Sequence, residues 1–344
     1  MLKIKPLLNA IALTFSVAMI TASANPAFAN SDNKNKLPDI GISGYSALSV
    51  DKERQIGLAM MRQIRASQPL IQDPVLLEYI NQLGNKLVKN ADNVSYPFEF
   101  FLVNNNELNA FAFFGGHVGI HSGLITTADT ESELASVLAH EISHVTQRHL
   151  ARRIESQGKN QGLTAAAMIS SILISLVNPA VGMAALSTTM AATQQAGINY
   201  TRGNEKEADR VGIALLAASD FDPQGAASFF QKMSERYRYA STPPAMLLTH
   251  PLPMSRITDA RQRAHSYPLR PLPPSLPFEL TKARLKSRYQ SDPKSNIDYY
   301  QRLLTKQHYA LKPAAEYGLA LSYFENKDLE KARNILEGLR ADVK

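Results

Sequence analysis

Hydrophobic and polar positions follow a helical period over most of the chain. Residues 50–65 come directly after Ser49, a residue typical of helix N-caps, and carry acidic residues in their first turn. Residues 74–90 open on a proline, which suits the first turn of a helix. A Thr-x-x-Glu capping pattern opens a helix predicted over residues 130–154, and residues 204–218 predict another. The chain is therefore expected to be mostly helical.

Two short segments predict strands instead. Residues 98–103 alternate apolar and other side chains, and residues 115–120 follow a glycine pair that predicts a turn. Helices with a small sheet predict an α+β fold. The second strand is either an edge strand, with which an extended polypeptide pairs and to which Gly115, Gly116 and Gly119 allow close approach, or one arm of a tight hairpin.

The first 29 residues have the pattern of a secretory signal peptide. Lys3 and Lys5 precede an apolar run over residues 7–20, and Ala27-Phe28-Ala29 forms a small-residue cleavage signal. The alternative is a transmembrane anchor, but this run is shorter than the ~20 residues that a spanning helix needs. We expect cleavage after Ala29 and export to the periplasm.

Charge and cysteine content exclude several classes of partner and site. The formal net charge is +7, and removing the two lysines of the first 29 residues leaves 7 − 2 = +5, with no run of Lys or Arg. Nucleic acid is therefore not an expected partner, and membrane contact would be at most peripheral, through anionic headgroups. Because the chain has no cysteine, a cysteine-linked lipid anchor is impossible, and a transition-metal site must use histidines and carboxylates.

Two histidines flank a glutamate in residues 140–144, HEISH, in a chain with eight histidines. Positions four apart share one face of a helix, so His140 and His144 can point at a single metal ion. Zinc held by two histidines and a carboxylate keeps a fourth position for water, from which Glu141 can take a proton. The alternative is an ordinary amphipathic helix with a buried face that includes Leu138.

Residues 204–210, NEKEADR, offer a third ligand. Glu205 and Asp209 are again four apart, so Glu205 can bind the metal while Asp209 accepts the free N–H of a ligand histidine. Glu207 is on another face and is expected in solvent. The alternative is an exposed charged helix stabilised by Glu/Lys and Asp/Arg pairs.

The combination of motifs resembles zinc metallopeptidases of the HtpX/CAAX-prenyl-protease type. The resemblance rests on HEISH, on NEKEAD about sixty residues later, on Thr249-His250-Pro251 and on residues 109–125, and it covers about residues 45–265. It implies a gluzincin-type fold with one zinc ion per chain. His140, His144 and Glu205 would be the zinc ligands.

The resemblance also implies a function, that of a periplasmic zinc metalloendopeptidase. Glu141 would be the catalytic base, taking a proton from zinc-bound water and returning it to the leaving amine, with Asp209 in support. Exported members of the family imply misassembled outer-membrane β-barrel proteins as substrates, and a role in their assembly. Those proteins and their assembly machinery, reached through helical repeats, are the implied partners.

His250 lies in a loop flanked by prolines. In the family that the chain resembles, the matching histidine can occupy the open position of zinc, so His250 is a candidate for an inhibitory fourth ligand that is removed on activation. The alternative is a loop histidine with a local role. Arg256 either stabilises the oxyanion of the reaction or forms a salt bridge to an acid.

The second half of the chain leaves further alternatives open. Residues 164–190 are apolar and lack Lys and Arg, which predicts a helical hairpin packed in the core or over the cleft, or else a flap that contacts a membrane or a nascent barrel. Ala320, Tyr323 and Ala332 have the spacing of a tetratricopeptide repeat. The family usually carries a longer array, so this chain is either a short member or a truncated one.

The sequence thus predicts five regions. They are a signal peptide (1–29), a flexible lead-in (30–45), a zinc metallopeptidase domain (46–265), a proline-rich linker (266–290) and a region of tetratricopeptide-like helical repeats (291–344). Two rival functions remain: a zinc-stabilised chaperone or adaptor that acts by binding, and a zinc hydrolase of small molecules or cell-wall peptides.

Overall fold

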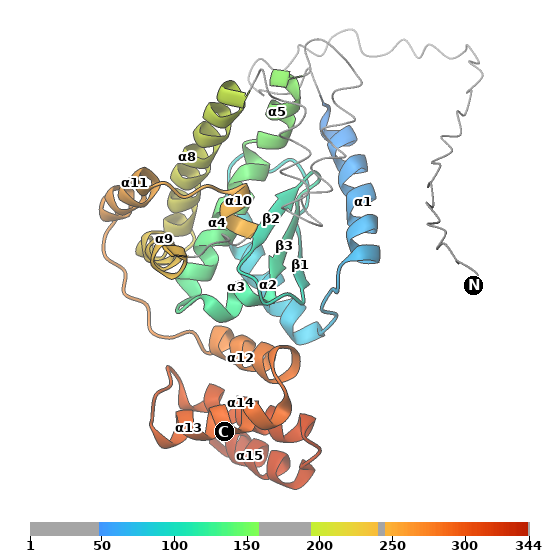
Figure 1. The fold of residues 1–344 in the computed structure, drawn as a ribbon, viewed down its shortest axis with the longest axis vertical. Helices are drawn as coiled ribbons and strands as arrows, with labels where there is room; N and C mark the ends of the chain where they lie inside the picture. The colour runs from blue at the N-terminus through green and yellow to red at the C-terminus, as the bar shows by residue number, and fades with distance from the viewer. Residues whose placement is uncertain (1–47, 158–193, 240–244, 343–344) are drawn as a thin grey trace, which may run out of the picture. The chain divides into compact units, whose positions relative to one another are not determined.

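A computed structural model describes residues 48–157, 194–239 and 245–342 (Figure 1). The expected signal peptide, the flexible lead-in and the apolar segment 164–190 lie outside these residues. Among the described residues, none of the helices is long and apolar enough to cross a membrane. The described part is mostly helical with one small sheet, which confirms the predicted fold class at that level.

The sheet has three strands in the order β1-β3-β2. β1 (Glu99–Val103) runs parallel to β3 (His117–His121), and β2 (Ala110–Phe113) runs antiparallel to β3. The sequence predicted β1 and β3 but not β2. The prediction of β3 as an edge strand is wrong, because β3 is hydrogen-bonded on both sides. The hairpin alternative is the correct one, and Gly115 and Gly116, both at φ of +81°, make its turn.

Alternate residues of the strands enter two hydrophobic cores, as the period of two requires. Phe100 and Leu102 pack into the larger core with α2 (Pro74–Val88), α4 (Glu131–Thr146), α8 (Gln194–Ala218) and α9 (Gln224–Tyr237). Phe101 and Val103 pack into the smaller core with α1 (Val50–Ser67) and α5 (His149–Gln157). The sheet therefore lies between α1 on one face and α4 on the other (Figure 1).

Helix caps fall where the sequence predicted them. The Ser49 side chain accepts a hydrogen bond from the Lys52 N–H, and the Thr130 side chain accepts one from the Glu133 N–H. These bonds satisfy N–H groups that the first turn leaves without helical partners. The helix predicted over residues 130–154 is, however, two helices, because α4 ends at Thr146 and α5 begins at His149.

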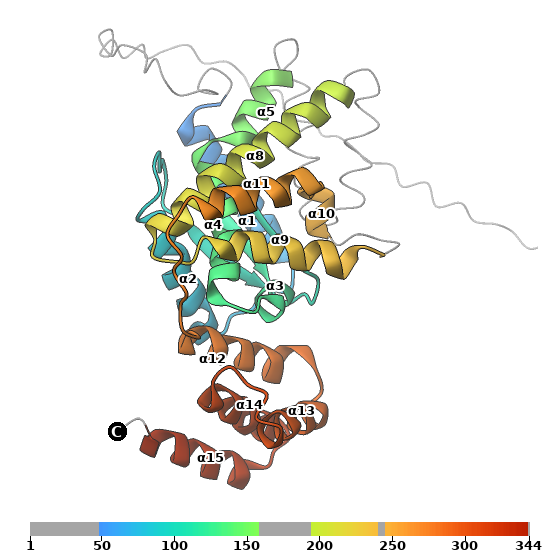
Figure 2. The same cartoon turned by 90° about the vertical axis from the view of Figure 1, so that its left-hand side faces the viewer.

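The remaining helices complete the domain that carries the HEISH motif. The sheet leads through β3 into the short helix α3 (Ser122–Thr127), and α10 (Ala245–Thr249) and α11 (Met254–His265) follow α9. α11 packs against both α8 and α9 (Figure 2). This packing places the loop between α10 and α11 beside the face shared by α4 and α8.

The C-terminal region begins earlier than the expected linker allows. Only residues 266–275 of the range 266–290 lie outside helices; α12 (Leu276–Leu285) begins after Ser275, whose side chain caps it, and a π-helix (Lys286–Gln290) follows. Proline suits the first turn of a helix, so Pro277 does not prevent α12 from forming. Phe278 and Leu285 of α12 are part of the larger core.

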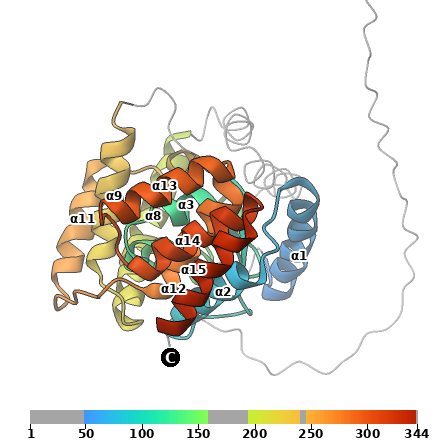
Figure 3. The ribbon, with the colours of Figure 1, turned by 90° about the horizontal axis from the view of Figure 1, so that it is seen from below.

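Three further helices end the described chain, namely α13 (Pro293–Thr305), α14 (Lys312–Glu325) and α15 (Leu329–Asp342). α14 packs against both α13 and α15 (Figure 3). Two salt bridges to the buried Oδ2 of Asp73, just before α2, link the C-terminal region to the rest. They come from Arg284 of α12 (2.8 Å) and from Arg288 of the π-helix (3.0 Å).

Candidate metal centre

His140 and His144 stand one turn apart on α4, on the face that α8 covers. The backbones of the two helices come close there: a Cβ added to Gly212 of α8 would lie 3.1 Å from the backbone nitrogen of His140. A larger residue would push the helices apart, so glycine at this position lets α8 bring Glu205 up to both imidazoles.

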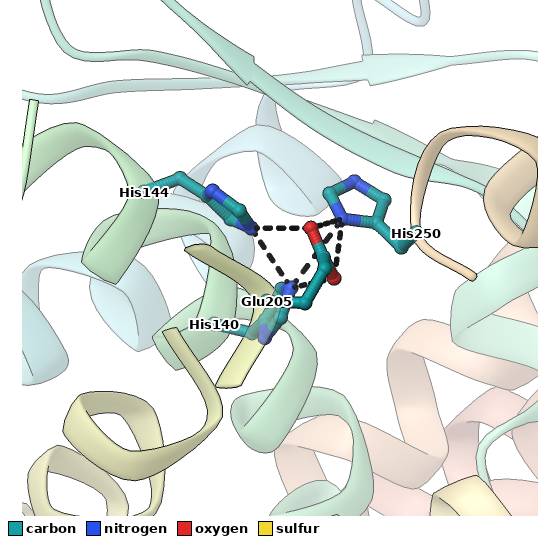
Figure 4. Close-up of side chains that lie close together, drawn as sticks. All are labelled: His140, His144, Glu205 and His250. Carbon is teal, nitrogen blue, oxygen red and sulfur yellow. Dashed lines mark hydrogen bonds and ion pairs between the residues drawn. The ribbon is translucent and has the colours of Figure 1, made fainter. Parts of the chain in front are cut away.

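Four side chains from three segments converge on one point (Figure 4). His140 and His144 come from α4, Glu205 comes from α8, and His250 comes from the end of α10. One ligand atom from each lies within 4.8 Å of every other. The Nε2 atoms of the two α4 histidines are 3.0 Å apart, and each lies 3.4 Å from a Glu205 oxygen. His250 Nδ1 lies 3.1 Å from Glu205 and 3.4 Å from His140 Nε2.

This donor set fits zinc. Bonds of about 2.0–2.1 Å at tetrahedral angles put ligand atoms about 3.3 Å apart, and imidazole nitrogen with carboxylate oxygen is a combination that zinc accepts. The observed separations of 3.0–3.4 Å match that spacing. The cluster could therefore hold one metal ion.

Glu141 lies beside the cluster and is almost completely buried, with 1% of its surface exposed. Its Oε1 is 3.5 Å from Nε2 of His250, and it accepts no hydrogen bond from the described residues. A buried carboxylate oxygen without a donor costs free energy, so its presence calls for an explanation, such as a role in catalysis. Its place against the cluster suits a group that accepts a proton from a bound water or substrate.

One histidine of the cluster is supported by a carboxylate. Nδ1 of His140 lies 3.0 Å from Oδ1 of Asp209, and Arg256 contacts both oxygens of Asp209 at 2.7 Å. Burial acts to lower the pKa of His140, but hydrogen bonds and the charges of Asp209 and Glu205 outweigh it and raise the pKa to about 10. We call Asp209 and Arg256 the Asp209 arm.

The other histidine is supported through a second imidazole. Nδ1 of His144 lies 2.8 Å from Nδ1 of His149, and Nε2 of His149 lies 3.0 Å from Oε2 of Glu207, which Arg152 contacts at 2.8 Å. Burial lowers the pKa of His144 to about 3, against the opposite effect of Glu205. We call His149, Glu207 and Arg152 the His149 arm.

The sequence did not predict the His149 arm. A continuous helix over residues 130–154 would carry His149 to a different face from His144, and Glu207 was expected in solvent. The break between α4 and α5, where Arg148 has a φ of +52°, turns the His149 ring back toward His144. No glycine or proline marks this break, so only an arginine with left-handed backbone distinguishes it.

Structural contacts account for Arg256 and for the histidines and Gly119 of β3. Arg256 forms the salt bridge that was one of its two alternatives, with Asp209 and also with Glu205 at 2.8 Å. His117 and His121 are buried in β3 and are not part of the four-residue cluster. Gly119 serves packing, because a Cβ there would lie 2.5 Å from the Phe111 ring.

Comparisons with known proteins agree with this centre. The model of peptidase family M48 matches residues 75–264, which include all four residues of the cluster. The chain belongs to peptidase family M48. The prediction of a metallopeptidase is therefore confirmed at the level of the family, and the cluster described here lies in the M48 domain.

Named relatives share most of this M48 chain. A protein of Escherichia coli (strain K12) named beta-barrel assembly-enhancing protease is 46% identical over 95% of this chain and 67% of its own length. A protein of Yersinia pestis with the same name is 48% identical over 89% of this chain and 63% of its own. A Vibrio cholerae serotype O1 relative is 49% identical over 93% and 66%. The chain thus spans about two thirds of the length of these relatives.

Proposed function

We propose that this chain is a zinc metalloendopeptidase, with His140, His144 and Glu205 as the metal ligands and Glu141 as the catalytic base. The observation that carries the proposal is the convergence of four ligand atoms from three segments within 4.8 Å of one another. Bound zinc would polarise a peptide carbonyl and lower the pKa of a water molecule. Membership of family M48 supports the same reaction.

Each residue around the cluster would have its own role in hydrolysis. Glu141, whose buried Oε1 accepts no hydrogen bond from the described residues, would accept the proton of the attacking water and deliver it to the leaving amine. Asp209 fixes the His140 ring by its contact with Nδ1, so that Nε2 faces the metal position. Arg256 holds Asp209 and Glu205 together and is too deeply buried in these pairs to serve as the oxyanion donor.

His250 gives the centre an inactive state in this proposal. Nδ1 of His250 lies beside the other three ligand atoms and would supply a fourth donor to a bound zinc ion, in the position that a water molecule would otherwise take. Withdrawal of the loop after α10 would open that position to water. Replacing His250 by alanine should therefore raise peptidase activity.

A substrate would lie along β2, not β3. Among the described residues, β2 pairs in the sheet with β3 alone, and it packs against α4, so its other edge would offer backbone groups to an extended polypeptide on the side of the metal ligands. An apolar recess beside His140 and His250, lined by Val137, Phe230, Met233, Met246 and Leu252, would take one apolar side chain of that polypeptide.

The names of the relatives supply the biological context. We propose that the chain acts in the periplasm on outer-membrane β-barrel proteins, cleaving misassembled ones and assisting assembly, after removal of a signal peptide over residues 1–29. Residues 46–265 would be the peptidase domain. Residues 291–344 would be tetratricopeptide-like repeats that dock it to the assembly machinery. The helix pairs α13–α14 and α14–α15, with the buried Ala320 and Ala332, support this role.

The test separates catalysis from binding. In a His250→Ala background, the added change Glu141→Gln should reduce cleavage of an unfolded protein substrate by about 100-fold or more while one zinc per chain is retained. Glu131→Gln, the same change in the first turn of α4, is the matched control and should leave the rate unchanged. If Glu141→Gln cleaves as fast as its parent, the peptidase mechanism is wrong. If it loses cleavage but keeps all cellular activity, a chaperone role is favoured.

A further inference from the structure

His149 is a buried histidine that lies between a metal ligand and a carboxylate. Only 3% of its surface is exposed, and both of its ring nitrogens have partners. Nδ1 lies 2.8 Å from Nδ1 of His144, and Nε2 lies 3.0 Å from Oε2 of Glu207. Buried ring nitrogens need hydrogen-bond partners in any protein, and what is particular here is that one of the two partners is a ring of the metal cluster.

The position of each proton follows from these contacts. His144 must present the lone pair of Nε2 to a metal ion, so its proton is on Nδ1, and that N–H donates to Nδ1 of His149. His149 then carries its own proton on Nε2 and donates it to Glu207. Glu207 also accepts a hydrogen bond from Arg152 at 2.8 Å. Every donor in this series meets an acceptor.

The turn that carries His149 is held by a separate buried network. Arg148 has left-handed backbone, which costs a non-glycine residue about 1 kcal/mol or more. Its guanidinium donates to Glu53 of α1, with Nε 2.9 Å from the carboxylate, and to the Leu48 carbonyl at 2.6 Å. Tyr96 donates a hydrogen bond to the same carboxylate. Side chains from α1 and from before β1 thus hold the break that aims His149 at His144.

We propose that His149 is a positioning residue of the metal centre, which fixes the ring of His144 through its Nδ1–H and is itself fixed by Glu207 and Arg152. The inference rests on the proposed metal site. It assigns to the α4–α5 turn a role in metal affinity and adds a second supporting arm beside Asp209. An outer hydrogen-bond partner of a ligand histidine is typically worth about 10- to 100-fold in metal affinity.

The test is zinc affinity of the purified full chain, measured by competition with a chelating dye. His149→Phe keeps a ring but loses both polar contacts, and should bind zinc about 10- to 100-fold more weakly than the wild type. His149→Asn keeps an acceptor near the place of Nδ1 and should lose less. His121→Phe changes a buried histidine of β3 and is the matched control, with unchanged affinity.

Glu207→Ala, at the half-buried end of the arm, provides a variant with little risk to folding. It should weaken zinc binding several-fold, and Lys206→Ala, next to it on the exposed side of α8, should not. The visible spectrum of the cobalt-substituted protein should also change in His149→Phe and not in His121→Phe, because only the first alters the setting of a ligand.

Three results would overturn the inference: wild-type affinity in His149→Phe, equal losses in the His149 and His121 variants, or a larger loss in His149→Asn than in His149→Phe. The last two would show that His149 acts only through packing. If the wild-type chain itself binds no zinc, or His144→Ala binds it normally, the proposed metal site has failed instead.

Discussion

The two metal-site histidines of α4, His140 and His144, differ in the group that contacts their Nδ1 atom. His140 meets the carboxylate of Asp209 directly, and Arg256 neutralises that carboxylate deep in the protein, with side-chain exposures of 2% and 4%. His144 meets a neutral imidazole first, and the carboxylate and arginine of its arm, Glu207 and Arg152, are 28% and 26% exposed. Both arms hold a histidine ring in place. The carboxylate–arginine pair of the Asp209 arm lies inside the core, whereas that of the His149 arm lies near solvent.

This difference teaches that one centre can combine a charged and a neutral support. A carboxylate in direct contact keeps a proton on His140, whereas an intervening imidazole lets burial dominate at His144. The Asp209 arm should therefore dominate stability and pH dependence. The His149 arm should affect metal affinity more than folding.

The largest expected effect is a loss of folding stability when the Asp209 arm is broken. Arg256→Met would remove the guanidinium that Asp209 and Glu205 share and leave Asp209 with the His140 imidazolium alone, and breaking a buried pair from one side typically costs up to about 3–5 kcal/mol. The free energy of unfolding in urea, measured on metal-free protein, should fall by that amount. Arg261→Met, on the exposed side of α11, is the control and should change it by less than about 1 kcal/mol. Equal effects in the two variants would show that Asp209 does not depend on Arg256.

The second effect is on the pH dependence of zinc binding. The raised pKa of His140, about 10, means that the metal-free protein carries a proton there at neutral pH, which zinc must displace. That proton stabilises the metal-free fold fully below pH 6.5, and the stabilisation is lost as the pH rises through about 10. Glu205 and Glu141 also raise the pKa of His250 against the effect of burial, so zinc affinity should rise by at least about tenfold per pH unit between roughly 7 and 10.

Changes in the two arms should affect the pH dependence of zinc affinity differently. Asp209→Asn removes the charge that holds the proton on His140, so the slope of zinc affinity against pH should become shallower. Glu207→Gln should leave the slope unchanged, because the pKa of His144 is lowered and no proton has to leave. A shallower slope in Glu207→Gln alone would reverse the assignment of the two arms.

The smallest expected effect concerns the outer end of the His149 arm. Arg152 and Glu207 form a pair that is about three quarters covered, so Arg152→Met should lower the free energy of unfolding by about 1 kcal/mol or less. The loss should shrink in 1 M salt, because salt screens charges near solvent. A loss as large as that of Arg256→Met would place the pair in the core.

The sequence predicted the site correctly where the interacting residues are close together in the chain. Spacings of four placed His140 with His144 and Glu205 with Asp209, because helical geometry alone puts such pairs on one face. The capping residues Ser49 and Thr130 were predictable because a hydroxyl side chain at the N-cap bonds N–H groups of the next turn. The resemblance to HtpX/CAAX-prenyl-protease-type metallopeptidases added His250, which local geometry could not place against the cluster.

The sequence failed where distant segments decide the outcome. β2 lies in the segment between the two predicted strands, and its pairing with β3 makes it a strand and moves β3 to the centre of the sheet. The end of α4 depends on Glu53, which is 95 residues from Arg148 in the chain and holds it in a left-handed conformation. His149 therefore had no local signal that it would face His144.

Metal content tests most directly the claim that these side chains bind one ion. Two glutamates that are two residues apart on α8 have different predicted roles, Glu205 as a ligand and Glu207 as an outer support. Purified Glu205→Ala should contain no zinc, since it loses a ligand of the cluster, whereas Glu207→Ala should retain one zinc per chain at saturating metal. One zinc per chain in Glu205→Ala, or none in the wild type, would contradict the convergence of these side chains on a single ion.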